Sequence, residues 1–360
     1  MFKITLDHVK NIGKFIGIIC LLLFGITNTS SAQELPEPLY ISEVGTIQNI
    51  YWSSDEENLV FQYAQRAVID GVLTTSQLGP WFTYRANEGR EQNLVESADR
   101  PQALTNMNSR FSFPPQAVTS RGFQSFLFPS PNQRYIAYAT GLVAGLDSYN
   151  IYALAIVDLE SGNATIFEDV LLNFSSNNMF IDYEIRWSAN SQALIITSAL
   201  MLPGATRYYV NLGNADSEPY AINFENTYFN NELINITRLL DISEDGNRVL
   251  TYAQAESGNN IFVWNANQPD QSTSTKAVPT GGLSGGAFSP EGEGWIYYID
   301  GQGLHIYNLI TEESQLLNPE INASRFGFAY FSPNGNQIAL YDFVSDNHDS
   351  IYLYNINEES

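Results

Sequence analysis

One short motif recurs six times along the chain and constrains its fold more than any other feature. Its clearest copy is Phe331-Ser332-Pro333-Asn334-Gly335, and an apolar run begins six residues after the serine. In such a turn proline presets φ, glycine accepts a positive φ, and the serine hydroxyl can bond the nearby backbone. The run that follows is short and rich in Ile, Val and Tyr, which is typical of a buried strand. The six serines are Ser53, Ser130, Ser188, Ser243, Ser289 and Ser332.

A second pattern, an apolar and aromatic run that ends at Asp or Asn, follows each of the last five copies. These runs are 151–158, 208–211, 261–265, 304–308 and 351–355, with a weak equivalent at 81–84 after the first copy. The serines are 77, 58, 55, 46 and 43 residues apart. Four-stranded units repeating at about this length are typical of β-propellers. The sequence therefore predicts an all-β fold, a six-bladed β-propeller of four-stranded antiparallel blades, whose recurring aromatic residues pack in the core.

The two ends of the chain are expected to close this ring together. The last blade lacks a fourth strand, because the chain stops five residues after Asn355. Residues 38–44 (PLYISEV) precede the first motif and have the composition of a strand. We therefore expect 38–44 to pair with the last blade and to supply its fourth strand.

The repeats resemble those of the TolB-like propellers, a family of secreted and periplasmic bacterial proteins related to WD-repeat proteins. The resemblance rests on the F-S-P-x-G-x-x-I-A units and the I-Y-x-x-[ND] strands, and it covers about residues 38–360. It implies a six-bladed propeller that binds another protein outside the cytoplasm. The Tol–Pal component of this family has an α/β domain before its propeller, whereas only residues 33–51 separate the first repeat from the leader here. We therefore expect a different member of the family, and that component's lipoprotein partner is not carried over.

The N-terminus has the three parts of a secretory signal peptide. Lysines precede a 12-residue apolar run at 15–26, and small residues occupy Ser30 and Ala32. Twelve apolar residues are fewer than the ~20 that span a bilayer. We therefore expect 1–32 to be a signal peptide and 33–360 to be a single propeller domain. The mature protein would be periplasmic, on the cell surface or secreted, with no transmembrane anchor.

The charge and the cysteine content exclude several classes of protein. The chain has 39 acidic and 16 basic residues, for a formal charge of −23. Loss of residues 1–32 would remove three lysines and one aspartate and leave −25. A nucleic-acid binder needs a basic surface, so that class is disfavoured. With Cys20 as its only cysteine, the chain cannot form thiol-based metal sites or disulfide frameworks.

The longest gap between motifs indicates an insertion at about 66–121, in or after the first blade. The window 66–134 holds seven arginines and five acids, so it is net +2 in an otherwise acidic chain. Long loops on rigid scaffolds often carry binding sites, and Arg, Tyr and Trp dominate binding hot spots. We therefore expect a protein or peptide partner at this insertion or at one mouth of the central channel. The candidate binding residues are Trp81, Tyr84, Arg85, Arg90, Arg110 and Arg121.

No set of catalytic or metal-binding residues stands out in the sequence. The G-x-S-x-G pattern around Ser284 needs a helix after it to expose the serine, but a propeller strand and turn follow here. Residues 241–246 resemble the start of a calcium-binding EF-hand loop, yet Tyr252 stands where a bidentate Glu is required. The leading hypothesis is a non-catalytic binding module without a cofactor. The alternatives are a hydrolase or lyase acting on polysaccharide or peptide, and an envelope scaffold stabilised by a cation such as calcium.

Overall fold

The protein is described by a computed structural model in which the chain forms two compact units, Met1–Glu34 and Leu35–Ser360. All described residues belong to the second unit, so the predicted signal peptide lies outside them. No helix in the described part is long and apolar enough to cross a membrane. The described residues are 35–41, 46–52, 58–69, 72–85, 94–97, 128–142, 151–168, 170, 183–198, 207–214, 217–224, 226–229, 232–255, 258–266, 276–277, 279, 281–289, 294–342 and 349–356.

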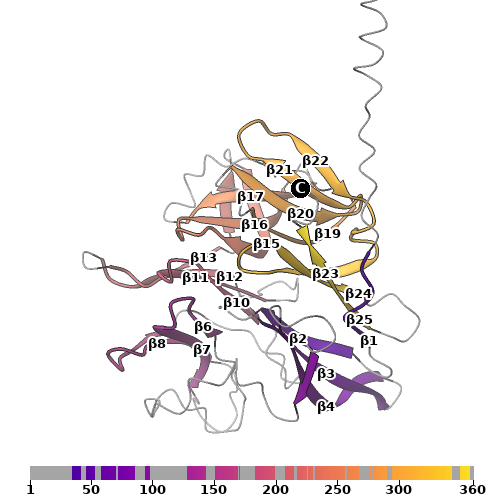
Figure 1. Ribbon diagram of the computed structural model, residues 1–360. Helices are drawn as coiled ribbons and strands as arrows, with labels where there is room; N and C mark the ends of the chain where they lie inside the picture. The colour runs from indigo at the N-terminus through magenta and orange to yellow at the C-terminus, as the bar shows by residue number, and fades with distance from the viewer. Residues whose placement is uncertain are drawn as a thin grey trace, which may run out of the picture. The chain divides into compact units, whose positions relative to one another are not determined.

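Leu35–Ser360 folds into six antiparallel sheets, each of which is one blade of a β-propeller (Figure 1). Blade one consists of β2 (Thr46–Trp52), β3 (Asn58–Ile69), β4 (Val72–Arg85) and β5 (Leu94–Ser97). Blade two consists of β6 (Phe128–Pro129), β7 (Tyr135–Leu142), β8 (Ile151–Asp158) and β9 (Ala164–Phe167). Blade three consists of β10 (Tyr183–Trp187), β11 (Ala193–Ser198), β12 (Arg207–Asn211) and β13 (Tyr220–Asn223).

The other three blades follow the same plan, except that blade four has a fifth strand. Blade four consists of β14 (Asn226–Phe229), β15 (Glu232–Ile242), β16 (Arg248–Ala255), β17 (Gly258–Asn265) and β18 (Lys276–Ala277). Blade five consists of β19 (Leu283–Phe288), β20 (Trp295–Asp300), β21 (Leu304–Asn308) and β22 (Ser314–Asn318). Blade six consists of β23 (Phe326–Phe331), β24 (Gln337–Asp342), β25 (Ser350–Asn355) and β1 (Tyr40–Ile41). The predicted fold class is confirmed.

The sequence motif marks the same place in every blade. One strand of each blade leads into the motif and ends at the residue before its serine, namely β2, β6, β10, β15, β19 and β23, and we call these the inner strands. The next strand of each blade begins five or six residues after that serine. Two of the recurring tryptophans also link blades, because Trp52 Nε1 donates to Tyr330 O at 2.8 Å and Trp187 Nε1 donates to Phe128 O at 3.0 Å. The motif therefore positions one blade on the next as well as turning the chain.

Hydrophobic packing between neighbouring blades completes the ring. Blades one, two and three share one buried cluster, and the pairs three–four, four–five, five–six and six–one each share another. In the cluster of blades six and one, Tyr341 packs with Ile47 and Phe61. Both faces of a blade are thus covered by its neighbours, so the second and third strands read as nearly continuous apolar runs.

The N-terminal segment closes the ring as predicted. Tyr40 pairs with Ile351 and Ile41 pairs with Ser350, so β1 is the fourth strand of blade six. The backbone N–H of Leu39 also donates to Ile351 O at 2.7 Å. The pairing covers fewer residues than the predicted 38–44, because 42–45 lie outside the described residues. Closure by an N-terminal strand ties the two ends of the propeller together through backbone hydrogen bonds.

The motif turn is held by its serine and by a polar residue two positions later. In the four copies whose turns are described, serine Oγ accepts from the N–H five residues on, at 2.9–3.0 Å. The same hydroxyl donates to a side-chain Oδ1 two residues on, at 2.7–2.8 Å. That oxygen belongs to Asn132, Asn190, Asp245 and Asn334. The acidic and amide residues of the motif are therefore structural.

The third position after the serine has a positive φ whether or not it is glycine. Gly246 and Gly335 have φ values of 75° and 69°, and Gln133 has 57° in the same place. A left-handed conformation costs a non-glycine residue about 1–2 kcal/mol, and Gln133 is exposed. We expect Gln133→Gly to raise the free energy of unfolding by about 0.5–1 kcal/mol, after the larger entropy of unfolded glycine is deducted. Urea unfolding measures this, with Gly335→Ala as the reciprocal variant, and lower stability of Gln133→Gly would contradict it.

The first part of the predicted insertion is a ribbon of two strands in blade one. β2 pairs with β3 only as far as Ala64, whereas β3 and β4 continue to pair up to Ile69 and Val72. That register leaves two residues, Asp70 and Gly71, for the connection, and Asp-Gly is a strongly preferred pair for a two-residue hairpin. The gap between motifs is therefore long partly because blade one has long strands. The rest of the gap, 98–127, lies outside the described residues.

Candidate functional site

Two of the six predicted binding residues, Trp81 and Tyr84, are buried in the core. Trp81 is 4% exposed and packs with residues of blades two and three, and Tyr84 is 8% exposed and packs with blade six. Both lie on β4, which pairs with β3 and β5 in its sheet and whose two faces are each covered by a neighbouring blade. Arg85 ends that strand and is exposed. The others, Arg90, Arg110 and Arg121, lie outside the described residues.

The two motifs that resembled catalytic or calcium sites have structural roles. Ser284 lies in β19, is 1% exposed, and donates its hydroxyl proton to the carbonyl of Phe326 in blade six. In the EF-hand-like segment Asp241 faces other blades, and Asp245 binds Ser243 within the motif turn. The described residues contain no group of three or more Asp, Glu, His or Cys that could hold a metal ion.

A partly buried ion pair joins four blades at the centre of the ring. Arg186 of β10 contacts Asp241 of β15, with 3.2 Å between Nη1 and Oδ1. Nη2 of the same arginine donates to Phe331 O of blade six at 3.0 Å. The other carboxylate oxygen of Asp241 accepts the N–H of Phe288 in blade five at 2.8 Å. Since blades three and six are opposite members of a ring of six, the Arg186 side chain reaches across the centre.

Burial governs the protonation of this pair. The two side chains are only 16% and 15% exposed. Desolvation raises the pKa of Asp241, although the charge of Arg186 and the hydrogen bonds to the carboxylate lower it. Removing the two charges from water therefore costs free energy, and the pair links strands of different blades at defined positions. We interpret the pair as a structural crosslink between blades, at the ends of the inner strands, and we call it the central ion pair.

A second arginine lies among the inner strands, and within the described residues it forms no ion pair with a carboxylate. Arg238 of β15 is 6% exposed, and its Nη1 donates to Ser284 O of blade five at 3.0 Å. Its guanidinium carbon lies 6.0 Å from the centre of the Phe328 ring in blade six. The side chain therefore extends from blade four past blade five to blade six. No sequence signal singled it out, because a lone arginine in a strand shows nothing about its partners.

His305 links three strands of blade five. Its Nε2 lies 3.0 Å from Asp300 Oδ1 and its Nδ1 lies 3.2 Å from Ser314 Oγ. Tyr298 stacks on the imidazole, with 4.8 Å between ring centres. The order Ser–His–Asp is that of a hydrolase triad, but the histidine is 6% exposed and Asp300 also caps a hairpin turn by accepting the N–H of Gln302. Because Tyr298, Asp300 and Ser314 contact the imidazole within one blade, we interpret the group as a structural crosslink.

The motif turns and the connections between third and outer strands lie at the same edge of each blade, and we call this side the turn face. Its turns contact one another between blades, since Asn132 N–H donates to Ser191 Oγ at 3.1 Å and Asn190 Nδ2 donates to Asp245 O at 2.8 Å. Carboxylates dominate its exposed charged residues. The exposed acids of the described turns are Glu160, Glu218, Glu244, Asp245, Glu312 and Glu313.

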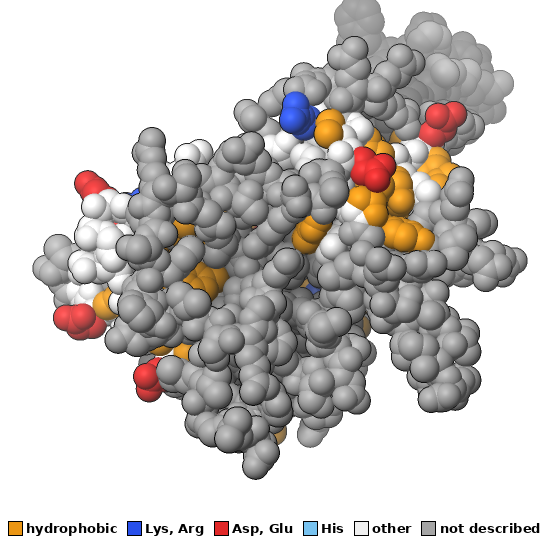
Figure 2. Space-filling model, turned by 90° about the horizontal axis from the view of Figure 1, so that it is seen from below, with side chains coloured by type: hydrophobic (Ala, Val, Ile, Leu, Met, Phe, Trp, Pro, Cys, Tyr) orange, Lys and Arg blue, Asp and Glu red, His pale blue; other side chains and the backbone are white. Residues whose placement is uncertain are grey.

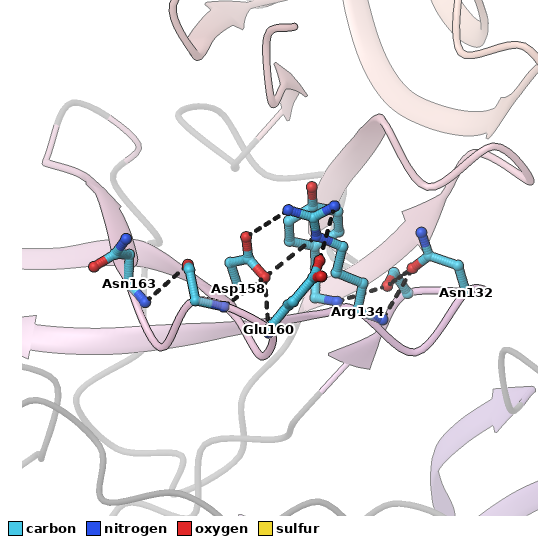
Figure 3. A network of polar contacts seen from close by, with 8 residues as sticks. Asn132, Arg134, Asp158, Glu160 and Asn163 are labelled. Carbon is cyan, nitrogen blue, oxygen red and sulfur yellow. Dashed lines mark hydrogen bonds and ion pairs between the residues drawn. The ribbon is translucent and has the colours of Figure 1, made fainter. Parts of the chain in front are cut away.

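Arg134, an exposed arginine of this face, is paired with carboxylates of its own blade. Figure 3 shows Arg134 between the acidic side chains, with 2.9 Å from Nη2 to Asp158 Oδ2 and 3.2 Å from Nη1 to Glu160 Oε2. The hydrogen bond from Arg134 lowers the pKa of Asp158, which also accepts N–H groups of the turn that follows it. The turn face therefore presents a net negative surface.

Hydrophobic side chains are also exposed in the described part of the protein. Figure 2 shows a group of them on one face, with acidic side chains beside them and at other places on the same face. The exposed large hydrophobic residues are Ile41, Val95, Ile166, Leu233, Ile310 and Leu316. Most of these lie on strands at the outer edge of a blade, where single apolar residues are ordinary.

No known family profile and no curated protein sequence matches the chain. Solved structures similar to it include TolB from Acinetobacter baumannii, which is 13% identical with a TM-score of 0.38 over 75% of this chain and 53% of that chain. The chain thus spans about half the length of that TolB structure. An oligogalacturonate lyase in complex with manganese is 10% identical (TM-score 0.46, 91% of this chain, 95% of that chain). An oligogalacturonate lyase from Vibrio parahaemolyticus is 12% identical (TM-score 0.45, 89% and 93%).

Because these scores are low, the assignment of the fold rests on strand pairing within the chain. Six sheets in sequence order, each packed on the next, with an N-terminal strand in the last sheet, define a six-bladed β-propeller. This topology is consistent with the TolB-like family that the repeats resemble.

Proposed function

We propose that the chain is an exported, non-catalytic propeller that binds a protein or peptide partner on its turn face. The part of the partner that contacts this face is a positively charged segment. A leader of the signal-peptide type supports export, and the fold supports a binding role, since propellers present rigid loops around a central axis. This surface surrounds one mouth of the ring centre, the place where the sequence already favoured a partner.

The observation that carries the proposal is the charge of the turn face. Six exposed carboxylates project from turns of blades two to five, while Arg134 is already paired with its neighbours. Like charges held on neighbouring turns repel one another, and a basic partner relieves that repulsion. Complementary charge also speeds association and disfavours acidic competitors. At the centre of this face Arg186 and Asp241 satisfy each other, so the proposed contacts come from the surrounding turns.

Charge reversal on the turn face tests the proposal. We expect the triple variant Glu218→Lys, Glu244→Lys, Glu313→Lys to lose capture of the native partner from the cell envelope, because all three side chains are exposed and lie on different blades. The partner is identified by mass spectrometry, and its affinity for each variant is then measured by calorimetry. Affinity should fall at least about tenfold and should become less sensitive to salt.

A second variant tests the other predicted surface. Arg110→Glu and Arg121→Glu reverse charge in the segment 66–121 beyond β5, and they leave the turn-face acids in place. Under the proposal this variant binds the partner as the wild type does. Loss of binding in the arginine variant together with full binding in the acid variant would move the site to the segment 66–121. Unchanged binding in both would contradict a partner at either surface.

A further inference from the structure

Arg238 is a buried residue whose guanidinium group makes few hydrogen bonds in the described structure. The side chain is 6% exposed and makes one hydrogen bond, from Nη1 to Ser284 O at 3.0 Å. The contact with the face of Phe328, at 6.0 Å, is at the outer limit of a cation–π interaction. A guanidinium carries five N–H donors and stays protonated in proteins, so most of its hydrogen-bonding capacity is unused here.

Two nitrogens of the Arg238 guanidinium group remain available for a ligand. Nε and Nη2 of Arg238 make no hydrogen bond within the described part of the chain, and neither atom is fully enclosed. Both nitrogens lie on one side of the planar fork, which is the side that binds the two oxygens of a carboxylate. A buried cation without a counter-charge is costly, and that cost falls when an anion binds.

Two partly exposed arginines of the described structure have a carboxylate partner. Arg186 contacts Asp241, and Arg325 lies 3.5 Å from Asp342. Within the described residues Arg238 forms no such ion pair. Arg238 therefore differs from these two arginines in having no carboxylate partner among the described residues, and a ligand can supply a carboxylate.

We propose that Arg238 anchors a site for the carboxylate group of a small organic acid, among the inner strands at the centre of the ring. A carboxylate fits the planar fork with two parallel hydrogen bonds. The acid is small and singly charged, because the 6% exposure of Arg238 admits little and because Asp241 lies on the same strand. This site goes beyond the partner surface of the turn face and does not depend on it.

Calorimetric unfolding in sodium acetate, with sodium chloride at equal ionic strength as the reference, tests the site. A ligand that binds only the folded state raises Tm as its concentration rises. We expect wild-type Tm to increase with acetate and not with chloride. Arg238→Gln should abolish the acetate response, and Arg238→Lys, which keeps the charge and loses the fork, should weaken acetate binding about tenfold. The control Arg325→Gln should respond as the wild type does.

The Tm of the ligand-free protein is a second measurement of the role of Arg238. Replacement of Arg238 should lower this Tm if the arginine has a structural role, and should not lower it if the arginine binds a ligand. Without acetate, Arg238→Met is expected to have a Tm equal to or above that of the wild type, because an uncompensated buried charge is removed. A lower Tm for Arg238→Met, together with no acetate response in the wild type, would overturn the proposal. The same holds if acetate stabilises Arg238→Gln as strongly as the wild type.

A carboxylate of the chain itself is the competing occupant. β10 carries Glu184 two residues before Arg186, and the side chain of Glu184 lies outside the described part of the structure. If Glu184 pairs with Arg238, then Glu184→Gln should lower Tm and should create an acetate response that the wild type lacks. That pair of results would overturn the proposal, whereas an acetate response of equal size in Glu184→Gln and the wild type supports it.

Discussion

Replacing Arg186 with alanine is expected to lower the free energy of unfolding by about 3–5 kcal/mol, the largest effect of any single substitution considered for this protein. The change leaves Asp241 buried without its counter-charge and removes the hydrogen bond to Phe331 O. Because the arginine joins blades three, four and six, the loss should weaken the whole ring. Urea unfolding followed by tryptophan fluorescence measures the change.

Two further variants separate the buried charge from simple loss of packing. The double variant Arg186→Met, Asp241→Leu removes both charges, and we expect it to recover most of the stability that Arg186→Ala loses. Arg134→Ala removes an exposed arginine from a comparable ion pair on the surface, and it should change Tm little. If Arg186→Ala were no more destabilising than Arg134→Ala, the central ion pair of Arg186 and Asp241 would not contribute to stability.

The penalty of Arg186→Ala is also expected to depend on pH. Burial already raises the pKa of Asp241, and the arginine opposes that rise, so its removal raises the pKa further. Between the unfolded pKa of about 3.9 and the raised folded pKa, the folded state binds more protons than the unfolded state. Stability in this window therefore increases as pH falls. The difference between Arg186→Ala and the wild type should narrow on acidification from neutral pH, and a constant difference would contradict the assignment to Asp241.

Replacing Asp349 with alanine is expected to lower the free energy of unfolding by about 2–4 kcal/mol. Asp349 is 4% exposed, and its Oδ2 accepts the hydroxyl of Tyr341 at 2.6 Å and the N–H of Ile47 at 3.1 Å. Ile47 belongs to blade one, whereas Tyr341 belongs to blade six. The substitution leaves two buried donors unpaired at the junction where the ring closes.

Hydrogen exchange at the Ile47 amide checks the location of this effect. In Asp349→Ala that amide should exchange faster, and amides of blades three and four should change only as much as global stability does. Asp349→Asn keeps one acceptor oxygen and should lose about half as much stability. Glu244→Ala, at an exposed position of the turn face, serves as the neutral control. Uniform faster exchange in all blades would mean that Asp349 has no special role in closure.

Much of the fold was predictable because local chemistry repeats. Each motif serine orders its own turn through a hydrogen bond to the N–H five residues on, as at Ser332 and Gln337, so a short window of sequence contains all the partners. The closing strand was predictable for a similar reason, since a propeller blade with three strands has an unpaired edge that the segment 38–44 can fill. The Asp-Gly pair at 70–71 would also have predicted the long hairpin of blade one.

Burial of individual residues was not predictable, because composition does not show it. Trp81 and Tyr84 are aromatic residues of the segment 66–121, and both are buried. The sequence marks their strand only by the weak equivalent at 81–84, whereas β4 is 14 residues long.

The sequence by itself determined the number of blades, the place of every inner-strand end and the closure of the ring, because those features depend on turn chemistry and apolar runs within a few residues. Only the tertiary structure decided the partners of the central arginines. Arg186 and Asp241 are 55 residues apart, and Arg186 and Phe331 are 145 residues apart. Such contacts exist only once six blades surround a common axis. The same assembly places Arg238 where no carboxylate of the described residues pairs with it, which no pattern along the chain could reveal.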